Sequence, residues 1–502
     1  MSKASAKRWK HTSPLAAIFY LGRIVDAIAK NAVQTFVPLA AYLATSEGPL
    51  FTRIIIATAT FFVIIIAASI VRYWFFRYRI TDDSVLIREG VFKKTQLDIK
   101  FDRIQAINTQ QNVIYRYFDL VTVKFDTAGS AKQEGNLPAI KTSLADSLKE
   151  RIRRDRPAVV TADGEEEAPP DIRPLLTLDN ADMVRIGLSN NRALIFLALL
   201  GPLMERIGEQ VEAQVEAGAF TLITGGAEVT LVTGTLIGAA VGVGIILLLM
   251  IASIIGAFLR YHRYSLVADD DVLRSTGGLL TRHEHSTNLA KIQTFEARQN
   301  PVLRLFKRFR LRAKQASSGK PGRSKHFVVP LCDRTQLPTL ADEVFREEFP
   351  GIDMLPDSED FQPISIRYFR SRLILVGVLP ALLASGLGYL LAGPVGLVLL
   401  AWIPLVAVVV WMMYKKRGYR LSEYGLVLRR GFIGIRTNAF LHRKVQRISI
   451  TQTIIQKRKG LATVRFYLAS GSLKMPYVDF ELAKTLRDFV LYRVESSKLA
   501  WH

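Results

Sequence analysis

Few side chains in this 502-residue sequence have the types and spacing that catalysis or metal binding requires. His283 and His285 alternate on a predicted strand, as two metal ligands could, but no cysteine and no obvious third ligand lies near them. The single cysteine, Cys332, lies among apolar residues and has no histidine partner evident in the sequence, which favours a buried thiol over a nucleophile. We therefore expect no catalytic residue, no metal and no cofactor, and the protein is predicted not to be an enzyme.

The strongest chemical signal is cationic. In the segment RLFKRFRLRAK, which begins at Arg304, the later residues alternate between basic and apolar, as in a strand with one charged face. Basic residues below an anionic leaflet each contribute about 1 kcal/mol of attraction. A solubilising face is the alternative. We expect no nucleic-acid partner, because no aromatic platform interleaves the charges. The candidate surface for anionic lipid or an acidic partner comprises Arg304, Lys307, Arg308, Arg310, Arg312 and Lys314.

The composition indicates a membrane protein with an anionic partner. Apolar residues make up 49% of the chain and charged residues 22%, yet the mean hydropathy is +0.19, so long apolar runs alternate with charged blocks. The formal net charge of +23 favours partners such as phospholipid head groups. One cysteine excludes an internal disulfide, which is compatible with a reducing compartment.

The apolar runs predict six transmembrane helices arranged as three hairpins. Uncharged runs at 54–71, 231–259 and 373–414 are long enough to cross a membrane, and the last holds two crossings joined by a turn at Gly393. The weaker segments 31–46 and 193–204 complete the first two hairpins; whether the second of these, with 12 residues, spans fully is left open. A stripe of small residues suited to close helix packing comprises Gly234, Gly238 and Gly242.

Charge bias predicts the orientation. Basic residues flank the same end of every hairpin, whereas the loop between the third and fourth segments is acidic, with Glu205, Glu209, Glu212, Glu216 and Glu228. By the positive-inside rule, the three charged blocks and both termini are cytoplasmic.

Each hairpin precedes a block that contains one repeated phrase. Its frame is a basic residue, Ile or Val, and Gln, with a second Gln six positions after the first. A glycine precedes the phrase at Gly90, Gly278 and Gly431, where a tight strand connection favours positive φ. We interpret the amides as partners for backbone groups where a strand bends, with a shared docking site as the alternative. The repeated residues are Arg103, Ile104, Gln105 and Gln111; Lys291, Ile292, Gln293 and Gln299; and Lys444, Val445, Gln446 and Gln452.

Period-two strands, glycine turns and one terminal amphipathic helix predict a small antiparallel barrel closed by that helix. The arrangement resembles the bacterial pleckstrin-homology-like (bPH2) membrane proteins of the YdbT-like group, through the Arg-Ile-Gln frame, the later glutamine, the TAGS at 127–130 and the Leu-Pro before the last helix. The resemblance implies an integral inner-membrane protein with pleckstrin-homology (PH) domains and implies no enzyme. The predicted fold class is α + β, with six transmembrane helices as three hairpins alternating with three cytoplasmic PH-like β-barrels.

These patterns divide the chain into nine segments. They are a basic tail with an amphipathic interfacial helix (1–30), hairpin 1 (31–76), domain 1 (77–156), an acidic proline-containing linker (157–185), hairpin 2 with its acidic external loop (186–259), domain 2 (260–350), a linker (351–372), hairpin 3 (373–414) and domain 3 (415–497).

The leading functional hypothesis is a non-enzymatic, multi-pass protein of the bacterial cytoplasmic membrane. Its three cytoplasmic domains bind or organise anionic lipid head groups or envelope proteins, as a scaffold. A transporter or lipid-export component is the alternative. Transport sites generally need ionisable groups at membrane depth, and only Arg23, Asp26 and Lys30 come close to it. The expected partners are membrane lipids, with a membrane protein or a homo-oligomer as further options.

Overall fold

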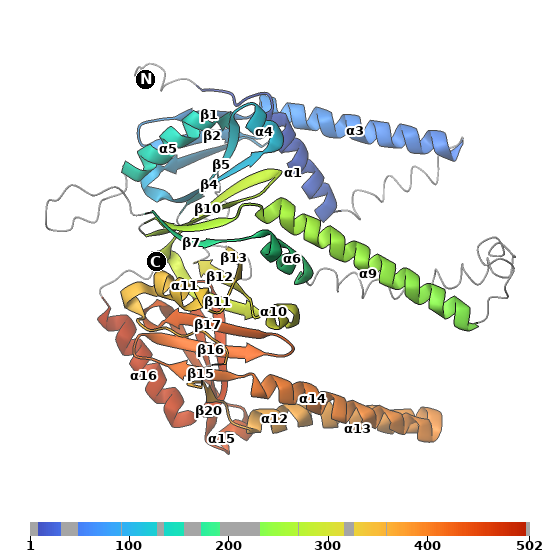
Figure 1. Ribbon diagram of the computed structural model, residues 1–502. Helices are drawn as coiled ribbons and strands as arrows, with labels where there is room; N and C mark the ends of the chain where they lie inside the picture. The colour runs from blue at the N-terminus through green and yellow to red at the C-terminus, as the bar shows by residue number, and fades with distance from the viewer. Residues whose placement is uncertain are drawn as a thin grey trace.

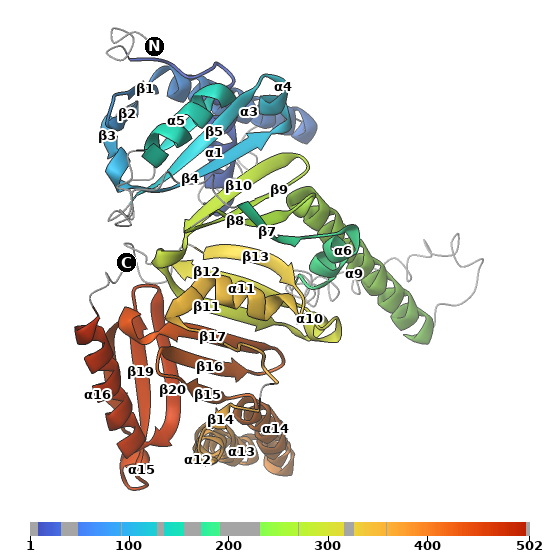
Figure 2. The ribbon, with the colours of Figure 1, turned by 60° about the vertical axis from the view of Figure 1, so that its left-hand side comes forward.

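The computed structural model describes residues 9–31, 49–91, 93–127, 135–154, 172–190, 231–269, 271–315, 326–357 and 359–497. The three domains form a column of sheets, and the long apolar helices project from one side of this column in the same direction (Figure 1). A second view shows the sheets of the three domains following one another along the column (Figure 2).

Each domain contains two sheet halves followed by a helix. In domain 1 the first half is β1 (Arg77–Ile80), β2 (Ser84–Glu89) and β3 (Thr95–Lys100), the second half is β4 (Ile104–Asn112), β5 (Leu120–Thr127) and β6 (Asn136–Lys141), and the helix is α5 (Thr142–Arg154). In domain 2 they are β7 (Ile172–Thr177), β8 (Ser265–Asp269), β9 (Val272–Gly277) and β10 (Thr281–Asn288), then β11 (Ile292–Gln299), β12 (Phe309–Gln315) and β13 (His326–Cys332), then α11 (Gln336–Phe345). In domain 3 they are β14 (Gln362–Pro363), β15 (Gly418–Leu421), β16 (Gly425–Gly431) and β17 (Ile435–Leu441), then β18 (Val445–Thr451), β19 (Leu461–Leu468) and β20 (Gly471–Asp479), then α16 (Phe480–Ser496).

The first glutamine of the repeated phrase marks the bend between the two halves. In domain 2, Ile292 pairs with Gln315 and Thr294 with Lys314, so Gln293 is an extra residue in its strand. Register shifts at the equivalent places bracket Gln105 in β4 and Gln446 in β18. A β-bulge of this kind bends a strand and increases its twist. The repeated phrase therefore encodes the corner at which each domain passes from one sheet to the other.

Strand pairing joins neighbouring domains edge to edge. β4 of domain 1 pairs antiparallel with β10 of domain 2, and β11 of domain 2 pairs antiparallel with β17 of domain 3. The resulting order is one three-stranded sheet, two seven-stranded sheets and one three-stranded sheet, namely β1-β2-β3, β6-β5-β4-β10-β9-β8-β7, β13-β12-β11-β17-β16-β15-β14 and β18-β19-β20.

The prediction of closed barrels is wrong for the part of the chain that the structure describes. A barrel would have to pair the first strand of the second half with the last strand of the first half of the same domain. The two strands instead diverge at the bulge, and the hydrogen-bonding edge of β4 or β11 is satisfied by the next domain. An unpaired edge exposes a row of backbone donors and acceptors, and a neighbouring strand covers that edge as effectively as closure does.

Each domain has a hydrophobic core, and two of the domains share theirs. Domain 1 packs Phe101 and Phe125 with α5, and domain 3 packs Phe440 and Phe466 with α16. The core of domain 2 extends across β17, because Ala439 and Leu441 of domain 3 belong to the same cluster.

Within the ranges that the structure describes, three stretches are long and apolar enough to cross a membrane: Phe51–Trp74 in α3 (Leu50–Trp74), Gly242–Tyr261 in α9 (Leu231–Tyr261), and Arg367–Lys415. The last runs through α12 (Arg367–Arg372), a π-helical turn, α13 (Leu379–Ala392), a 3₁₀ segment (Gly393–Ala401) and α14 (Trp402–Lys415).

The third apolar stretch reverses direction where the sequence predicts a turn. Gly393 has φ of 64°, and a Cβ on Gly396 would lie 2.2 Å from the Gly388 carbonyl carbon, so the two arms pack closely as a hairpin. The remaining two of the six predicted crossings, 31–46 and 193–204, fall almost wholly outside the described residues.

Glycine turns follow the sequence prediction at two of three positions. Gly90 and Gly278 have φ of 111° and 116°, the left-handed region that favours glycine. Gly431 instead ends β16 with negative φ. A side chain is excluded there by a close approach, because a Cβ would lie 2.2 Å from the Gly434 carbonyl oxygen.

Two predicted connecting segments contain structured elements. In the acidic linker, β7 joins the edge of the domain 2 sheet, and α6 (Asn180–Leu188) packs against α9, where Ser253 Oγ donates to the Gly187 carbonyl at 2.9 Å. The predicted interfacial helix is α1 (Ala16–Lys30), whose Ala16 and Tyr20 are buried against domain 1.

Candidate functional site

The basic residues predicted on one strand lie in the middle of a sheet. β12 pairs with β11 on one side and with β13 on the other. Phe309, Leu311 and Ala313 face the core, so Arg310 and Arg312 project from the opposite face.

The other four predicted basic residues are either more exposed or already paired. Arg304 and Lys307 are exposed around the end of α10 (Pro301–Leu305). Arg308 forms an ion pair with Asp333 at 3.0 Å, and Lys314 pairs with Glu296 at 2.6 Å. The six residues therefore do not form one continuous surface.

Four arginines lie directly opposite one another across four adjacent strands. Arg310 of β12 pairs in register with Arg298 of β11, Arg298 with Arg436 of β17, and Arg436 with Arg430 of β16. We call these four residues the arginine row. Like charges directly opposite one another destabilise a sheet, so the row is an unfavourable arrangement unless an anion compensates it.

The electrostatics of the row are consistent with a shortage of negative charge. Burial lowers the pKa of Arg298, and the charges of Arg436 and Arg312 lower it further. Burial also lowers the pKa of Arg430, where Arg436 and Arg417 act in the same direction and Glu296 opposes them. Among the described residues, Arg298, Arg430 and Arg436 form no ion pair, and Glu296 is held by Lys314.

The row lies at the end of the sheet nearest the apolar helices. Arg430 and Arg436 flank the β16–β17 turn, and Lys416, just after α14, donates to the Ile433 carbonyl of that turn at 3.0 Å. Phe432 and Ile433 are exposed at the same tip, as is Leu305 at the end of α10. Exposed apolar side chains beside cations are typical of a surface that contacts a membrane interface.

The equivalent tip between domains 1 and 2 has the same character. The Leu279 amide donates to the Leu259 carbonyl of α9 at 2.9 Å, which places the β9–β10 turn at the end of that helix. Leu279 and Leu280 are exposed there, together with Tyr117 and Phe118 after β4. The column therefore has two apolar tips on the side from which the helices project.

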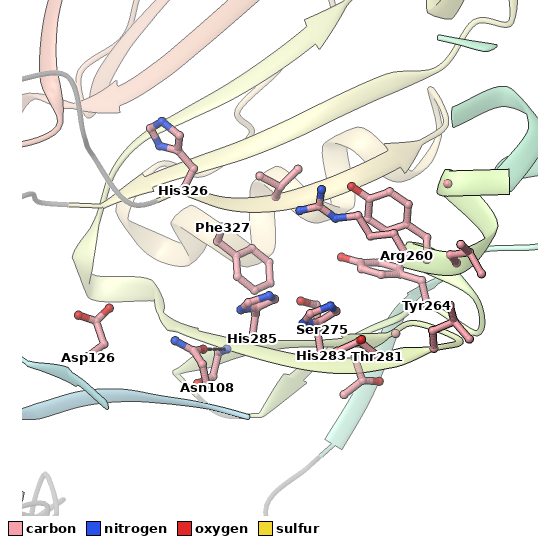
Figure 3. Close-up of a pocket in the computed structure, with 18 of the residues that line it drawn as sticks. Asn108, Asp126, Arg260, Tyr264, Ser275, Thr281, His283, His285, His326 and Phe327 are labelled. Atoms are coloured by element: carbon pink, nitrogen blue, oxygen red, sulfur yellow. Dashed lines mark hydrogen bonds between the residues drawn. The ribbon is translucent and has the colours of Figure 1, made fainter. Parts of the chain in front are cut away.

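A cavity of about 730 Å³ lies beside the end of α9, lined mostly by domain 2 and in part by Asn108 and Asp126 of domain 1 (Figure 3). Arg260 and Tyr264 line one side, and His283 and His285 rise from β10 on the other. The two imidazole rings are stacked, with centroids 5.9 Å apart and planes 7° apart. Burial, followed by the nearby charges of His285, Arg260 and Lys124, lowers the pKa of His283 to about 4. At neutral pH His283 is therefore uncharged beside the Arg260 cation, and Asp126 and His326 also line the cavity.

The histidines and the cysteine can be placed against their predicted roles. Within the described ranges no group of three or more potential metal ligands surrounds His283 and His285. Cys332 is buried in the core of domain 2, and burial, with the charge of Asp333, raises the pKa of its thiol.

The second glutamine of each repeat makes one recurrent hydrogen bond. Gln111, Gln299 and Gln452 each donate from Nε2 to the carbonyl nine residues later, at 2.9, 3.3 and 2.8 Å respectively. This bond ties the end of one strand to the start of the next. The residue after each glutamine caps the intervening short helix: Asn112, Asn300 and Thr453 accept from the amide three residues on.

The basic residue of the third repeat contacts the preceding domain. Lys444 is 4% exposed, and its Nζ donates to the Ala290 carbonyl at 2.9 Å and the Ile292 carbonyl at 2.7 Å. Burial, and secondarily the charge of Arg443, lowers the pKa of Lys444 to about 8. The first glutamine also differs with context, because Gln293 is buried at the junction whereas Gln446 is exposed.

Sequence reasoning missed Arg298, Arg430 and Arg436, because strands from two different repeats bring them together. The small-residue stripe lies within α9, where a Cβ on Gly242 would meet no atom within 4 Å. The helix-packing role of Gly234, Gly238 and Gly242 stays a prediction.

Comparison with known proteins agrees with the repeat. The Bacterial PH domain family matches at residues 28–156, 222–348 and 373–494. The chain is 23% identical over 486 residues to the UPF0699 transmembrane protein YdbT of Bacillus subtilis (strain 168), covering 92% of this chain and 93% of that protein. It is 30% identical over 84 residues to the UPF0699 transmembrane protein YdbS of the same organism, which covers 17% of this chain and 51% of YdbS.

No solved structure matches the chain. Because the family matches cover most of the sequence and recur three times, the chain is a transmembrane protein that belongs to the bacterial PH domain (bPH2) family and resembles YdbT.

Proposed function

We propose that this protein is a non-enzymatic scaffold of the bacterial cytoplasmic membrane. Its three PH domains lie along the cytoplasmic leaflet, and the arginine row binds the phosphates of anionic phospholipids. The observation that carries the proposal is the in-register placement of Arg310, Arg298, Arg436 and Arg430 beside the end of α14.

Head-group phosphates suit this surface chemically. Guanidinium groups bind phosphate through two parallel hydrogen bonds, and such charge-assisted bonds are about twice as strong as neutral ones. A phosphate between two neighbouring arginines would replace their mutual repulsion by attraction. The exposed Phe432, Ile433 and Leu305 would insert at the interface and hold the row against the leaflet.

The surroundings favour binding over simple solubilisation. A solubilising arginine extends into water, whereas all four arginines of the row are half-buried. The cavity beside Arg260 offers a second place for a polar head group, since it lies at the end of α9 and contains hydrogen-bonding side chains. A scaffold that holds lipids or envelope proteins needs this geometry and no catalytic group.

Lipid retention by the full-length protein tests the proposal. The protein is purified in mild detergent with mixed phosphatidylglycerol, cardiolipin and phosphatidylcholine, and retained lipids are counted by native mass spectrometry. The variant R298Q/R310Q/R430Q/R436Q is expected to retain anionic lipid at least about tenfold less well, since each cation contributes about 1 kcal/mol. Retention of phosphatidylcholine should not change.

A matched variant removes the same number of positive charges from the outer sheet and helix of domain 3. R447Q/R465Q/K474Q/K484Q alters β18, β19, β20 and α16 and leaves the row intact. It is expected to retain anionic lipid as the wild type does. Equal loss in both variants, or no loss in the first while its thermal unfolding is unchanged, would overturn the proposal.

A further inference from the structure

The two junctions between domains use one and the same pairing rule. At the first, Gln111 lies opposite Arg282 and Thr109 opposite Glu284. At the second, Gln299 lies opposite Ile435 and Ala297 opposite Thr437. Because the repeats are offset by 188 and then 153 residues, these are the same repeat positions. At both junctions, the first strand of the second half of one domain thus pairs with the last strand of the first half of the following domain, in the same register.

Among the strands that the structure describes, this pairing rule leaves two without a partner from another domain: the last strand of the first half of domain 1 and the first strand of the second half of domain 3. β3 of domain 1 pairs with β2 alone, and β18 of domain 3 pairs with β19 alone, within the part of the chain that the structure describes. Their exposure reflects this difference. In β11, which has neighbours on both sides, every residue except Arg298 is buried, whereas in β18 only Val445 is buried and in β3 only Ile99.

We propose that the protein assembles head to tail, with β18 of one copy pairing antiparallel with β3 of the next copy. The partner at each free edge is a second copy of this chain. β18 is the repeat equivalent of β4 and β11, and β3 is the repeat equivalent of β10 and β17, and these equivalents already pair with each other within the chain. The assembly extends the column by the rule that builds it, and it is independent of what the arginine row binds.

The rule specifies the register of the new pairing. It places Thr451 opposite Thr95, Ile450 opposite Gln96 and Ile448 opposite Asp98. No like charges are directly opposed in these pairs, in contrast to Arg298 and Arg436 at the second junction. The proposed register therefore lacks the like-charge opposition that the second junction tolerates.

A second contact follows from the same equivalence. Lys444 closes the second junction by donating to the carbonyls of Ala290 and Ile292. The equivalent residue of domain 1 is Arg103, which is exposed. In the assembly, Arg103 lies beside the carbonyls of Arg443 and Val445 of the neighbouring copy, and it can donate to both.

The geometry of the column suits growth within a membrane. The apolar helices of all three domains project from one side of the column, and β3 and β18 belong to its two end domains (Figures 1 and 2). Adding a copy at either end keeps its helices on that side. A heterologous interface of this kind closes into a ring if the rotation between neighbouring copies permits, and otherwise forms an open filament.

Disulfide crosslinking in native membranes tests the pairing and its register. Opposed residues of an antiparallel pair have Cβ atoms about 4.5–5.5 Å apart, close enough for a disulfide to form with slight adjustment. The full-length T95C/T451C variant is expected to give a ladder of dimers, trimers and larger species under mild oxidation, and a reductant should collapse it. The wild type, whose single Cys332 is buried, provides the background.

Two single variants distinguish the proposed mode from symmetric pairing. T95C and T451C chains with different tags should crosslink to each other when co-expressed, and neither should crosslink to itself. Dimers from T451C alone would show that β18 pairs with β18, which overturns the proposal. The variant Q96C/T451C is shifted by one residue, which places the cysteines on opposite faces, and should give no ladder.

An internal control occupies the same repeat positions at a known junction. R298C/R436C should form an intrachain disulfide, since those residues are directly opposed. Absence of the T95C/T451C ladder while this bond forms would overturn the proposal.

A measurement without cysteines complements the crosslinking. Two differently tagged wild-type copies should co-purify in mild detergent, and I450P, which disrupts the free edge of β18, should reduce co-purification at least about tenfold. Failure of the wild-type copies to co-purify would contradict the assembly. If β18 instead binds another bPH2 protein, the tagged wild-type chain would co-purify with a chain of different mass and not with a second tagged copy, and that too would contradict it.

Discussion

The junction between domains 1 and 2 is polar, whereas the junction between domains 2 and 3 is continuous with a hydrophobic core. At the first, Glu284 bonds Lys149 at 2.7 Å and Thr109 at 2.8 Å, and the cavity of Figure 3 lies alongside. At the second, Ala439 and Leu441 join the core of domain 2, and Lys444 is buried against domain 2 carbonyls.

The comparison separates what positions two domains from what holds them together. Both junctions have the same strand register, so the backbone ladder determines the geometry in each case. The side chains differ entirely, and they determine the strength, because burying apolar area contributes more than surface ion pairs do. A repeat can therefore keep one architecture while each interface is tuned separately.

The largest difference between the junctions is expected for a charge placed at one shared repeat position. Ala439 at the second junction is fully buried, so A439E should lower the free energy of unfolding by on the order of 4 kcal/mol, because an unpaired carboxylate enters the core. Its repeat equivalent at the first junction is Ser286, which is half-buried among polar groups. S286E should lower the free energy of unfolding by about 1 kcal/mol or less. Thermal unfolding of the full-length protein compares the two, and equal losses would refute the difference between the junctions.

The second prediction concerns the buried lysine. K444M leaves the carbonyls of Ala290 and Ile292 without their donor, and we expect it to destabilise the second junction by about 1–3 kcal/mol. Faster amide exchange in β11 and β17, measured by hydrogen–deuterium exchange, would report the loss. The matched variant K291M alters the same repeat position of domain 2 and should have a smaller effect, since Lys291 is only half-buried. A larger effect of K291M would be inconsistent with our interpretation.

The third prediction concerns the ion pair of the first junction. Burial raises the pKa of Glu284, but the hydrogen bond and charge of Lys149 outweigh it and hold the pKa below its ordinary value. The resulting stability is present above about pH 4.5 and is lost as the pH falls through the folded pKa. E284Q should destabilise the first junction by about 1 kcal/mol at neutral pH and remove this acid dependence. Amide hydrogen–deuterium exchange in β4 and β10, followed as a function of pH, measures the stability of this junction. An unchanged acid dependence in E284Q would count against this assignment.

The smallest effect at neutral pH is expected from the stacked histidines, which change the stability only in acid. The pKa of His283 is lowered to about 4, so the unfolded chain binds a proton more readily between pH 6.5 and 4. Stability is therefore fully present above pH 6.5 and declines as the pH falls through that window. H283N should reduce the decline of the melting temperature between pH 6.5 and 4, and the part that remains is expected from His285, whose pKa burial also lowers. H262N, next to the cavity-lining Tyr261, should leave the decline as it is. An unchanged decline in H283N would assign the acid sensitivity to another group.

The sequence predicted the order of the repeats, the bend and the third hairpin. It succeeded there because each rests on local chemistry: the repeated glutamine marks a bulge, and Gly393 begins the return arm of an uncharged stretch. The prediction of a closed barrel failed because the sequence of a strand does not show which other strand will pair with its free edge. Arg298 and Arg436 became neighbours only through that pairing, so the arginine row has no signature within any one repeat.

The most direct test of the account is whether all three domains lie on one side of the membrane, since β4–β10 and β11–β17 require it. D82C, E347C and S496C each place an exposed thiol in a different domain, and Cys332 is buried. A membrane-impermeant maleimide should label none of them in intact spheroplasts and all three after permeabilisation. Labelling of one domain without the others before permeabilisation would contradict a column of PH domains on a single, cytoplasmic face.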